Sequence, residues 1–283
     1  MDIRAIDGDF GAEVTGVDLS KGISKELAAT LVNTLHEYGI MAIRDQDLSP
    51  EEQCAFTESF GPLDIHHLAE ATFPEFPQLR VLTNVKKDGK LIGQFRGGHY
   101  WHTDITYTDN PALVTVLHGK ECPPEGGNTL FANMRGAYDN LPDDLRELVD
   151  GKVAVHDRAF RYSELYPERP PLTGEQISHV PPVEQPMILQ HPATGRKSVY
   201  LNKSMIRTIG DLDEAASEAL LEKLEAHCTQ DRFVYSHKWR PGDLVVWDNL
   251  STMHRATPYD FQKHRRVMHR TQVCGPHESV RAA

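Results

Sequence analysis

Many short strand-like runs, separated by glycine and proline, are the feature of this chain that most limits how it can fold. Each run holds a few β-branched, aliphatic or aromatic residues and is followed by turn-forming residues. The runs are 40–43, 80–83, 113–117, 187–190, 198–201, 233–235, 244–247 and 266–273. Many short strands with few helices are typical of a β-barrel or β-sandwich whose helices pack outside. The sequence therefore predicts a mainly β protein with flanking helices.

The few helices are marked by their start signals. Ser24 and Asp213 each precede apolar residues at helical spacing, and both have the short polar side chain that caps a helix N-terminus. Ser49 gives a sharper signal, because Pro50 stands at the first helical position and Glu52 completes a capping box. Three helices are therefore expected to begin directly after these residues.

Charge and composition argue against several classes of protein. The 283 residues carry a formal net charge of −11, which disfavours nucleic acid or an anionic membrane as the main partner. No apolar run approaches the roughly 18 residues of a membrane span, and the mixed, acidic start does not resemble a secretory leader. The four cysteines show no C-x-x-C spacing, so neither a zinc knuckle nor a disulfide framework is indicated. We expect a soluble cytoplasmic protein with a single domain, 1–283.

The segment around 160–186 differs from the rest of the chain. Six prolines fall between 162 and 186, and the segment has little periodicity. It is too long for a simple connection between two strands. It is interpreted as a lid or insertion over a site, with a plain surface excursion as the alternative.

The segment Tyr-Trp-His-Thr-Asp at 100–104 contains the first candidate metal ligands. On an extended strand alternate side chains share a face, so His102 and Asp104 can grip one ion. A second histidine is expected from the C-terminal third, where the apolar strand 244–247 leads through a loop to His254. Two imidazoles and one carboxylate, with the other positions open, are typical of non-haem iron(II) oxygenases. The absence of a cysteine ligand disfavours structural zinc.

A candidate anion site follows His254. On the strand 266–273, Arg266 and Arg270 share one face and lie roughly 13 Å apart, at about 3.3 Å per residue. Each planar guanidinium can clamp an acidic group with two hydrogen bonds. Arg266 is therefore assigned to the distal carboxylate of 2-oxoglutarate and Arg270 to an acidic group of the substrate. The hydroxyl of Thr129 can donate to the same 2-oxoglutarate carboxylate.

These residues belong to motifs that follow one another in a fixed order along the chain. The motifs are Trp-His-Thr-Asp at 101–104, Gly-Gly-Asn-Thr at 126–129, His-Pro-x-x-Gly-Arg-Lys at 191–197, Trp-Asp-Asn at 247–249 with His254, and Arg266. Together they resemble the taurine dioxygenase and aryloxyalkanoate (2,4-dichlorophenoxyacetate) dioxygenase family of Fe(II)/2-oxoglutarate-dependent oxygenases. The resemblance spans nearly the whole chain.

The resemblance implies a fold, a metal centre and an assembly. The implied fold is a double-stranded β-helix, the jelly roll shared with cupins. The implied cofactor is iron(II), held by His102, Asp104 and His254. The implied co-substrate is 2-oxoglutarate, held by Thr129 and Arg266. The family likeness also implies a cytoplasmic homo-oligomer, a dimer or a tetramer.

The resemblance weakens at the positions that choose the substrate. Arg270 matches the arginine that grips the sulfonate in taurine dioxygenase, and His66 matches a histidine that contacts substrate there. Three positions depart from that enzyme: Ala69 replaces a tyrosine, Gly98 an asparagine and Met205 a phenylalanine. These departures argue against taurine and leave a bulkier acid, such as an aryloxy acid, open. The expected reaction hydroxylates a C–H bond of a small carboxylate or sulfonate and releases succinate and CO2.

Three alternatives stay open at this point. The same iron centre can perform desaturation or oxidative decarboxylation of a small acid. A non-catalytic jelly-roll protein that binds a metal or a small acid would show no turnover of 2-oxoglutarate. A zinc hydrolase would need a general base beside the ligands and would have no use for Arg266.

Overall fold

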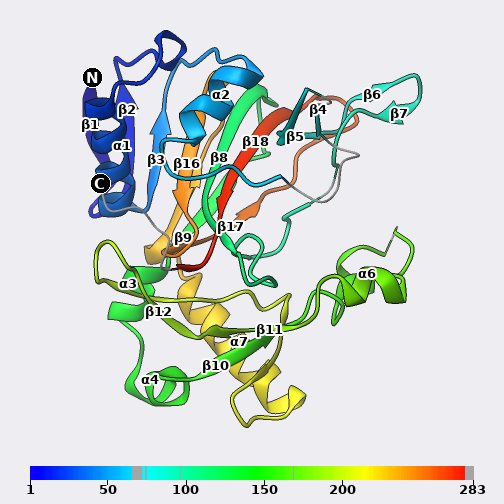
Figure 1. The fold of residues 1–283 in the computed structure, drawn as a ribbon. Coiled ribbons are helices and arrows are strands. Elements are labelled where there is room, and N and C mark those ends of the chain that lie inside the picture. Colours follow the sequence, from blue (N-terminus) through cyan, green and yellow to red (C-terminus); the bar gives the residue numbers. More distant parts are fainter. Residues whose placement is uncertain (66–71, 74, 96, 168, 278–283) are drawn as a thin grey trace.

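The computed structural model describes residues 1–65, 72–73, 75–95, 97–167 and 169–277 (Figure 1). Within these residues the largest sheet has eight strands, in the order β1-β2-β3-β16-β8-β18-β5-β4. Their bounds are β1 Asp2–Asp7, β2 Phe10–Thr15, β3 Ile40–Ile43, β16 Leu244–Asp248, β8 Ala112–Glu121, β18 Val267–Cys274, β5 Phe76–Thr83 and β4 Thr72–Phe73. Neighbouring strands are antiparallel apart from β2 and β3. Strands from both ends of the chain therefore pair in one sheet.

A second sheet lies against the inner face of the first. Its order is β15-β9-β17, and its strands are β15 Val234–His237, β9 Thr129–Asn133 and β17 Thr252–Ala256. Phe131 of the second sheet packs edge-on against Trp247 of the first, with ring centroids 5.4 Å apart. The two sheets do not close into a barrel. Together they form the jelly roll that the resemblance implied.

Alternation along the strands decides which side chains face the space between the two sheets. On β16, Leu244 and Val246 belong to an outer core, whereas Val245 and Trp247 belong to an inner core with Phe131. The neighbouring strand β3 keeps this alternation, with Met41 and Ile43 in the outer core and Ile40 and Ala42 in the inner core. The inner face is therefore the place where the two sheets can present side chains to one another.

Helices α1 (Lys25–Tyr38) and α2 (Pro50–Thr57) pack against the strands of the large sheet. The predicted caps are confirmed. The side chain of Ser24 accepts a hydrogen bond from the backbone of Leu27, and Ser49 and Glu52 form a reciprocal capping box. Asp213 caps α7 (Glu214–Cys228). The sequence was sufficient to place these three helix N-termini because a cap is a local interaction.

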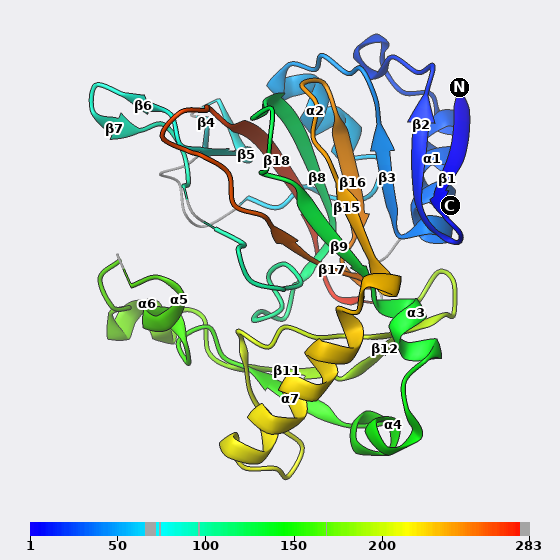
Figure 2. The ribbon, with the colours of Figure 1, turned by 180° about the vertical axis from the view of Figure 1, so that it is seen from behind.

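A third layer covers the far side of the second sheet, as Figure 2 shows from behind. This layer contains α7, α3 (Met134–Asp139), α4 (Asp143–Val149), β10 (Val153–His156), β11 (Val183–Pro186), β12 (Ile188–Gln190), β13 (Lys197–Val199) and β14 (Ile206–Ile209). The remaining described elements are two 3-10 helices, Leu19–Lys21 and Asp231–Phe233, and the hairpin of β6 (Lys86–Lys87) and β7 (Lys90–Leu91).

The segment around 160–186 is not devoid of regular structure. It contains two short helices, α5 (Tyr162–Leu165) and α6 (Gly174–Ser178), and ends in β11. Figure 1 shows α6 projecting away from the two main sheets. Each predicted strand overlaps an observed one, although β8 is about twice as long as expected. Across the described residues, none of the helices has both the length and the apolar character to cross a membrane.

Candidate active site

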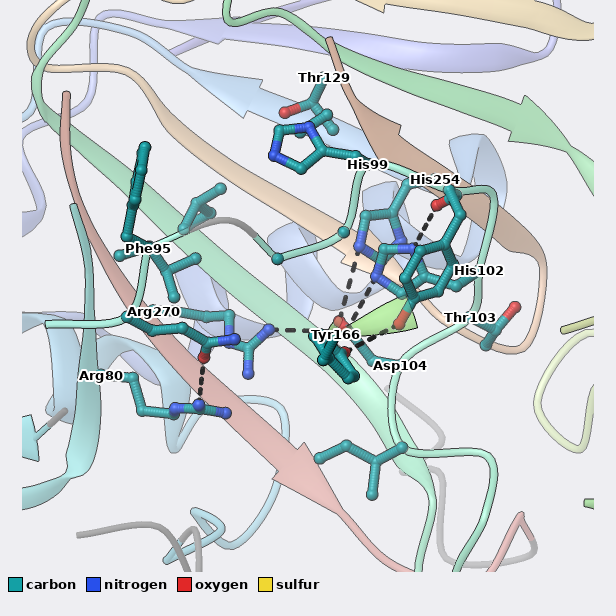
Figure 3. Close-up of a pocket in the computed structure, with 18 of the residues that line it drawn as sticks. Arg80, Phe95, His99, His102, Thr103, Asp104, Thr129, Tyr166, His254 and Arg270 are labelled. Carbon is teal, nitrogen blue, oxygen red and sulfur yellow. Dashed lines mark hydrogen bonds and ion pairs between the residues drawn. The ribbon is translucent and has the colours of Figure 1, made fainter. Parts of the chain in front are cut away.

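A cavity of about 320 Å³ opens between the inner face of the large sheet and the second sheet. Leu117, Trp247 and Arg270 line it from the first sheet, and Thr129 and His254 line it from the second. All of the predicted site residues that the structure describes lie around this cavity. Figure 3 shows several of them pointing toward one another.

His102, Asp104 and His254 converge in the cavity as predicted. Nε2 of His102 lies 3.7 Å from one carboxylate oxygen of Asp104, and Nε2 of His254 lies 3.8 Å from the other. One ligand atom from each residue lies within 4.8 Å of those of the other two. This spacing lets all three side chains bind a single ion from one side.

The backbone that delivers this triad differs in part from the prediction. His254 lies in the middle of β17 rather than at the end of a loop. His102 does not belong to an extended strand but forms a single bridge with His254, each backbone N–H donating to the other carbonyl, at 3.0 and 2.8 Å. Asp104 begins a turn, and the next residue, Ile105, has φ +52°, which is rare for a β-branched residue. The turn, rather than the alternation of side chains along a strand, therefore directs the Asp104 carboxylate toward the two histidines.

The protonation states of the triad suit metal binding. The Nδ1–H of His102 donates to the carbonyl of Tyr100 at 2.8 Å, which leaves the lone pair of Nε2 directed toward the other ligands. Burial lowers the pKa of His102 and lowers that of His254 to about 3, so both imidazoles are neutral near pH 7. Burial opposes ionisation of Asp104, but His254, Arg270 and His102 outweigh it and hold the pKa of the carboxyl at about 2. Two neutral imidazoles and one ionised carboxylate are the donor set that iron(II) accepts.

The side chain of Asp104 is oriented by a buried hydrogen-bond network that the sequence did not identify. Thr115 donates its hydroxyl to Asp104 Oδ2 at 2.9 Å and accepts from Asn249 at 2.9 Å and from Gln272 at 3.0 Å. The Asn249 carbonyl accepts from the backbone of Asp104 at 3.3 Å and from the indole of Trp247 at 3.2 Å. These five hydrogen bonds tie the Asp104 carboxylate and backbone to β8, β16 and β18, so the carboxylate has one preferred orientation.

The arrangement of β8, β16 and β18 explains the network. Thr115 of β8 stands opposite Trp247 on one side and Gln272 on the other. The Trp-Asp-Asn motif then brings Asn249 to the end of β16. The Trp-Asp-Asn motif marks Trp247 and Asn249 in the sequence, whereas nothing in the sequence marks Thr115 or Gln272.

Thr129 and Arg266 also line the cavity. The indole N–H of Trp239 donates to Thr129 Oγ1 at 2.9 Å, so the threonine hydroxyl can still donate to a ligand. Arg266 lies one residue before β18, and its backbone N–H donates to Asn84 at 2.9 Å. Burial lowers the pKa of Arg266, whose guanidinium nevertheless remains charged near pH 7.

Gly127 allows the loop before Thr129 to pass close to Arg266. Its φ is +63°, and a Cβ there would lie 3.6 Å from Cδ and Nε of Arg266 and 2.9 Å from Pro123 Cγ. A side chain at this position would therefore be both strained and crowded. Steric crowding at this position therefore explains the presence of Gly127 in the 126–129 motif.

Arg270 enters the cavity from β18, with Nη1 3.6 Å from Asp104 Oδ1. The other predicted substrate residue, His66, lies outside the described residues, as does Ala69. Gly98 and Met205 both line the cavity. A Cβ at Gly98 would lie 3.0 Å from Cε1 of His102, so a larger residue there would press on the imidazole. Gly98 therefore keeps space open beside His102.

Two imidazoles and one carboxylate, grouped on a jelly roll beside buried arginines, define the class of mononuclear non-haem iron oxygenases. Residues 2–272 match the family described as "Taurine catabolism dioxygenase TauD, TfdA family". The chain belongs to this family, and it is an Fe(II)- and 2-oxoglutarate-dependent dioxygenase.

Individual relatives agree over almost the full length. The (S)-phenoxypropionate/alpha-ketoglutarate-dioxygenase of Sphingobium herbicidovorans is 35% identical, over 97% of this chain and 95% of the relative. The alpha-ketoglutarate-dependent 2,4-dichlorophenoxyacetate dioxygenase of Cupriavidus pinatubonensis is 32% identical, over 93% and 94%. A crystal structure of AAD-2 in complex with Mn(II) and N-oxalylglycine has a TM-score of 0.85 at 33% identity, over 97% and 98% of the two chains.

Proposed function

We propose that this enzyme hydroxylates a C–H bond of a small organic anion and releases succinate and CO2. The observation that carries the proposal is that the triad, Arg266 with Thr129, and Arg270 all open onto one cavity. When bound, iron(II) and 2-oxoglutarate supply the activation of O2 and the oxidation of the C–H bond. The protein supplies positions for the three reactants.

Each group of residues has a separate task in this proposal. His102, Asp104 and His254 hold the iron, and the Thr115 network keeps Asp104 in its binding orientation. Arg266 pairs with the distal carboxylate of 2-oxoglutarate, and the free hydroxyl proton of Thr129 donates to the same group. Arg270 binds the anionic end of the substrate and so sets which carbon lies near the metal.

The wall of the cavity supports a substrate with an aromatic or otherwise bulky body. Phe95, Tyr107 and Tyr162 contribute rings to the lining, and Gly98 leaves room beside His102. Relatives named for phenoxypropionate and 2,4-dichlorophenoxyacetate support the same class of acid for this chain.

The first test is an anaerobic titration of the protein with Fe(II) and 2-oxoglutarate, followed by a panel of aryloxy acids, sulfonates and other carboxylates. At least one acid should stimulate succinate release with hydroxylation of that acid. In Arg270→Gln the KM for that acid should rise by about 30-fold or more, because a buried anion loses its cationic partner. An unchanged KM would place the substrate anion elsewhere, and a protein that binds neither Fe(II) nor 2-oxoglutarate would refute the function.

We further propose that the chain is one catalytic domain and that the segment around 160–186 is its lid. Tyr162, Tyr166 and Arg169 of this segment line the cavity. The hydroxyls of Tyr166 and Tyr100 lie 3.0 Å apart, and the guanidinium of Arg169 stacks 4.3 Å from the Tyr166 ring centroid. These contacts support a segment that covers the mouth of the site when substrate is bound.

Tyr166→Phe and Tyr100→Phe test the lid, because each removes the same hydrogen bond. Each should raise the substrate KM by about three- to tenfold, the value of one net hydrogen bond. The double variant should be no worse than either single variant. Tyr162→Phe is the matched control, since no hydrogen bond to a described residue involves its hydroxyl. Additive effects of the two substitutions on the substrate KM would show that the two hydroxyls do not act through one shared hydrogen bond.

The family likeness also supports a cytoplasmic homo-oligomer, and we extend the proposal to a dimer or tetramer. Light scattering on the purified protein decides this, and a monomer at micromolar concentration would contradict it.

A further inference from the structure

A second arginine stands beside Arg270 on the wall of the cavity. Arg80 of β5 is the direct cross-strand partner of Arg270 on β18. Directly paired residues have Cα atoms about 4.5–5.5 Å apart, so both side chains reach the same region. Arg80 is only 6% exposed, yet it lines the cavity together with Arg270. Figure 3 shows the two guanidinium groups on the same side of the triad.

The positive charge of Arg80 has little compensation within the described part of the chain. Its hydrogen bond goes to the neutral side chain of Gln94, and none of the ion pairs among described residues involves it. Burial and the nearby Arg270 lower the pKa of Arg80 to about 9, which still leaves it charged near pH 7. Arg270 lies 3.6 Å from Asp104, but that carboxylate also lies 3.7 and 3.8 Å from the two imidazoles and is a candidate metal ligand.

Two adjacent cations that are largely withdrawn from water, as Arg80 and Arg270 are, are costly unless an anion compensates them. With iron(II), doubly charged 2-oxoglutarate and Asp104 in place, the three arginines Arg80, Arg266 and Arg270 leave two positive charges in the cavity. A carboxylate or sulfonate carries one negative charge and would neutralise half of this excess. A group with two negative charges would neutralise all of it.

The outer arginines of the cavity do not change this argument. Arg158 stacks 5.6 Å from the Tyr107 ring centroid and Arg169 lies 4.3 Å from the Tyr166 ring centroid, and both line the same cavity. Their charges have the same sign as those of Arg80 and Arg270, so they would add to the preference for a doubly charged anion rather than remove it.

We infer that Arg80 and Arg270 form a single two-guanidinium site that selects a doubly charged, phosphonate-type group at the anionic end of the substrate. This inference rests on the proposed function and narrows the anion to one class. Two guanidiniums offer forked donors from adjacent strands, which suits a tetrahedral group with three terminal oxygens. The organic body of the substrate then extends past Gly98 toward the triad.

The test compares three ligands that share one body: phenoxyacetate, phenoxymethanesulfonate and phenoxymethylphosphonate. Binding to the protein loaded with Mn(II) and N-oxalylglycine is measured by calorimetry at about pH 8, where the phosphonate carries two charges. The sulfonate has the same shape with one charge, so it isolates the effect of charge. The phosphonate should bind at least about tenfold more tightly than the sulfonate. At about pH 6 the phosphonate takes up a proton, and its advantage over the sulfonate should shrink.

Substitutions of Arg80 test whether this residue causes the preference for the phosphonate over the sulfonate. Arg80→Met should bring the phosphonate-to-sulfonate affinity ratio to about one, because a hydrophobic side chain of similar length replaces the second charge. Arg80→Lys should keep most of the ratio. Arg4→Met is the control, since Arg4 is exposed and paired with Asp2 far from the cavity, and it should leave the ratio unchanged.

Three results would overturn the inference: no phosphonate binding, equal affinity for phosphonate and sulfonate in the natural protein, or a preference that survives in Arg80→Met. Failure of the proposed function looks different, because then no acid stimulates succinate release. Turnover of a carboxylate or sulfonate without any preference for the phosphonate would remove this inference and leave the dioxygenase function intact.

Discussion

Asp104→Ala is expected to abolish substrate-dependent succinate formation and to weaken iron(II) binding by more than about 100-fold. Loss of a hydrogen-bond partner behind a metal ligand already costs about 10- to 100-fold, and loss of the ligand itself must cost more. The substitution also removes the negative charge 3.6 Å from Arg270, so two neutral imidazoles would face an uncompensated cation. Anaerobic Fe(II) titration measures the affinity, and a succinate assay measures turnover.

Two further variants test whether the loss of iron(II) binding is specific to the Asp104 carboxylate. Thr115→Val keeps the carboxylate but removes the hydroxyl that donates to it at 2.9 Å, so it should weaken iron(II) binding by about 10- to 100-fold. Asp109→Ala removes an exposed carboxylate a few residues along the chain and should behave like the natural protein. Full activity in Asp104→Ala would show that this triad does not hold the iron. The assignment of the cavity as the active site would then be wrong.

Local signals in the sequence predicted the parts of this fold that depend on neighbours in the chain. The caps at Ser24, Ser49 and Asp213 were correct because a cap is formed by residues three positions apart. The candidate metal triad was proposed because its residue types are restricted by the chemistry of iron(II), and its three side chains do converge. Neither inference needed the register of the sheets.

The parts that the sequence did not predict depend on pairing across long distances. Gln272 donates to Thr115, and the two residues are 157 positions apart in the chain. Arg80 and Arg270 meet only because β5 and β18 are neighbours in this register. A shift of one residue in either pairing would turn these side chains to the opposite face. A single sequence contains no marker of that register.

The geometry around Asp104 was mispredicted for a different reason. Strand alternation predicted that His102 and Asp104 share a face, whereas the structure has a one-residue bridge at His102 followed by a turn. The turn contains Ile105 at positive φ, a conformation that residue propensity disfavours. Such local strain is held by the surrounding structure and often occurs beside a functional group. The three candidate ligands therefore meet in the structure, although the backbone predicted for them was wrong.

Arg266→Met is expected to raise the KM for 2-oxoglutarate by about 100-fold or more while leaving iron(II) binding in the absence of 2-oxoglutarate within about twofold. Removing one partner of a buried charge pair costs about 2–5 kcal/mol, and every 1.4 kcal/mol is a factor of ten. Among the described residues, no hydrogen bond or ion pair joins the Arg266 side chain to His102, Asp104 or His254, so its loss should leave the three candidate ligands in place. The backbone N–H of residue 266 that donates to Asn84 is retained. Methionine fills a similar volume without the charge.

The adjacent residue provides the control for Arg266. Arg265 is 64% exposed in its side chain and pairs with Glu121 at 2.9 Å on the surface, so Arg265→Met removes the same charge without touching the cavity. Its KM for 2-oxoglutarate should change by less than about twofold, because exposed ion pairs contribute little. Steady-state kinetics at saturating acid measures both variants. Equal effects in the two would mean that the net positive charge of this strand, rather than a clamp at Arg266, attracts 2-oxoglutarate. An unchanged KM in Arg266→Met would move the 2-oxoglutarate carboxylate to another cation in the cavity, with Arg80 and Arg270 as the first candidates.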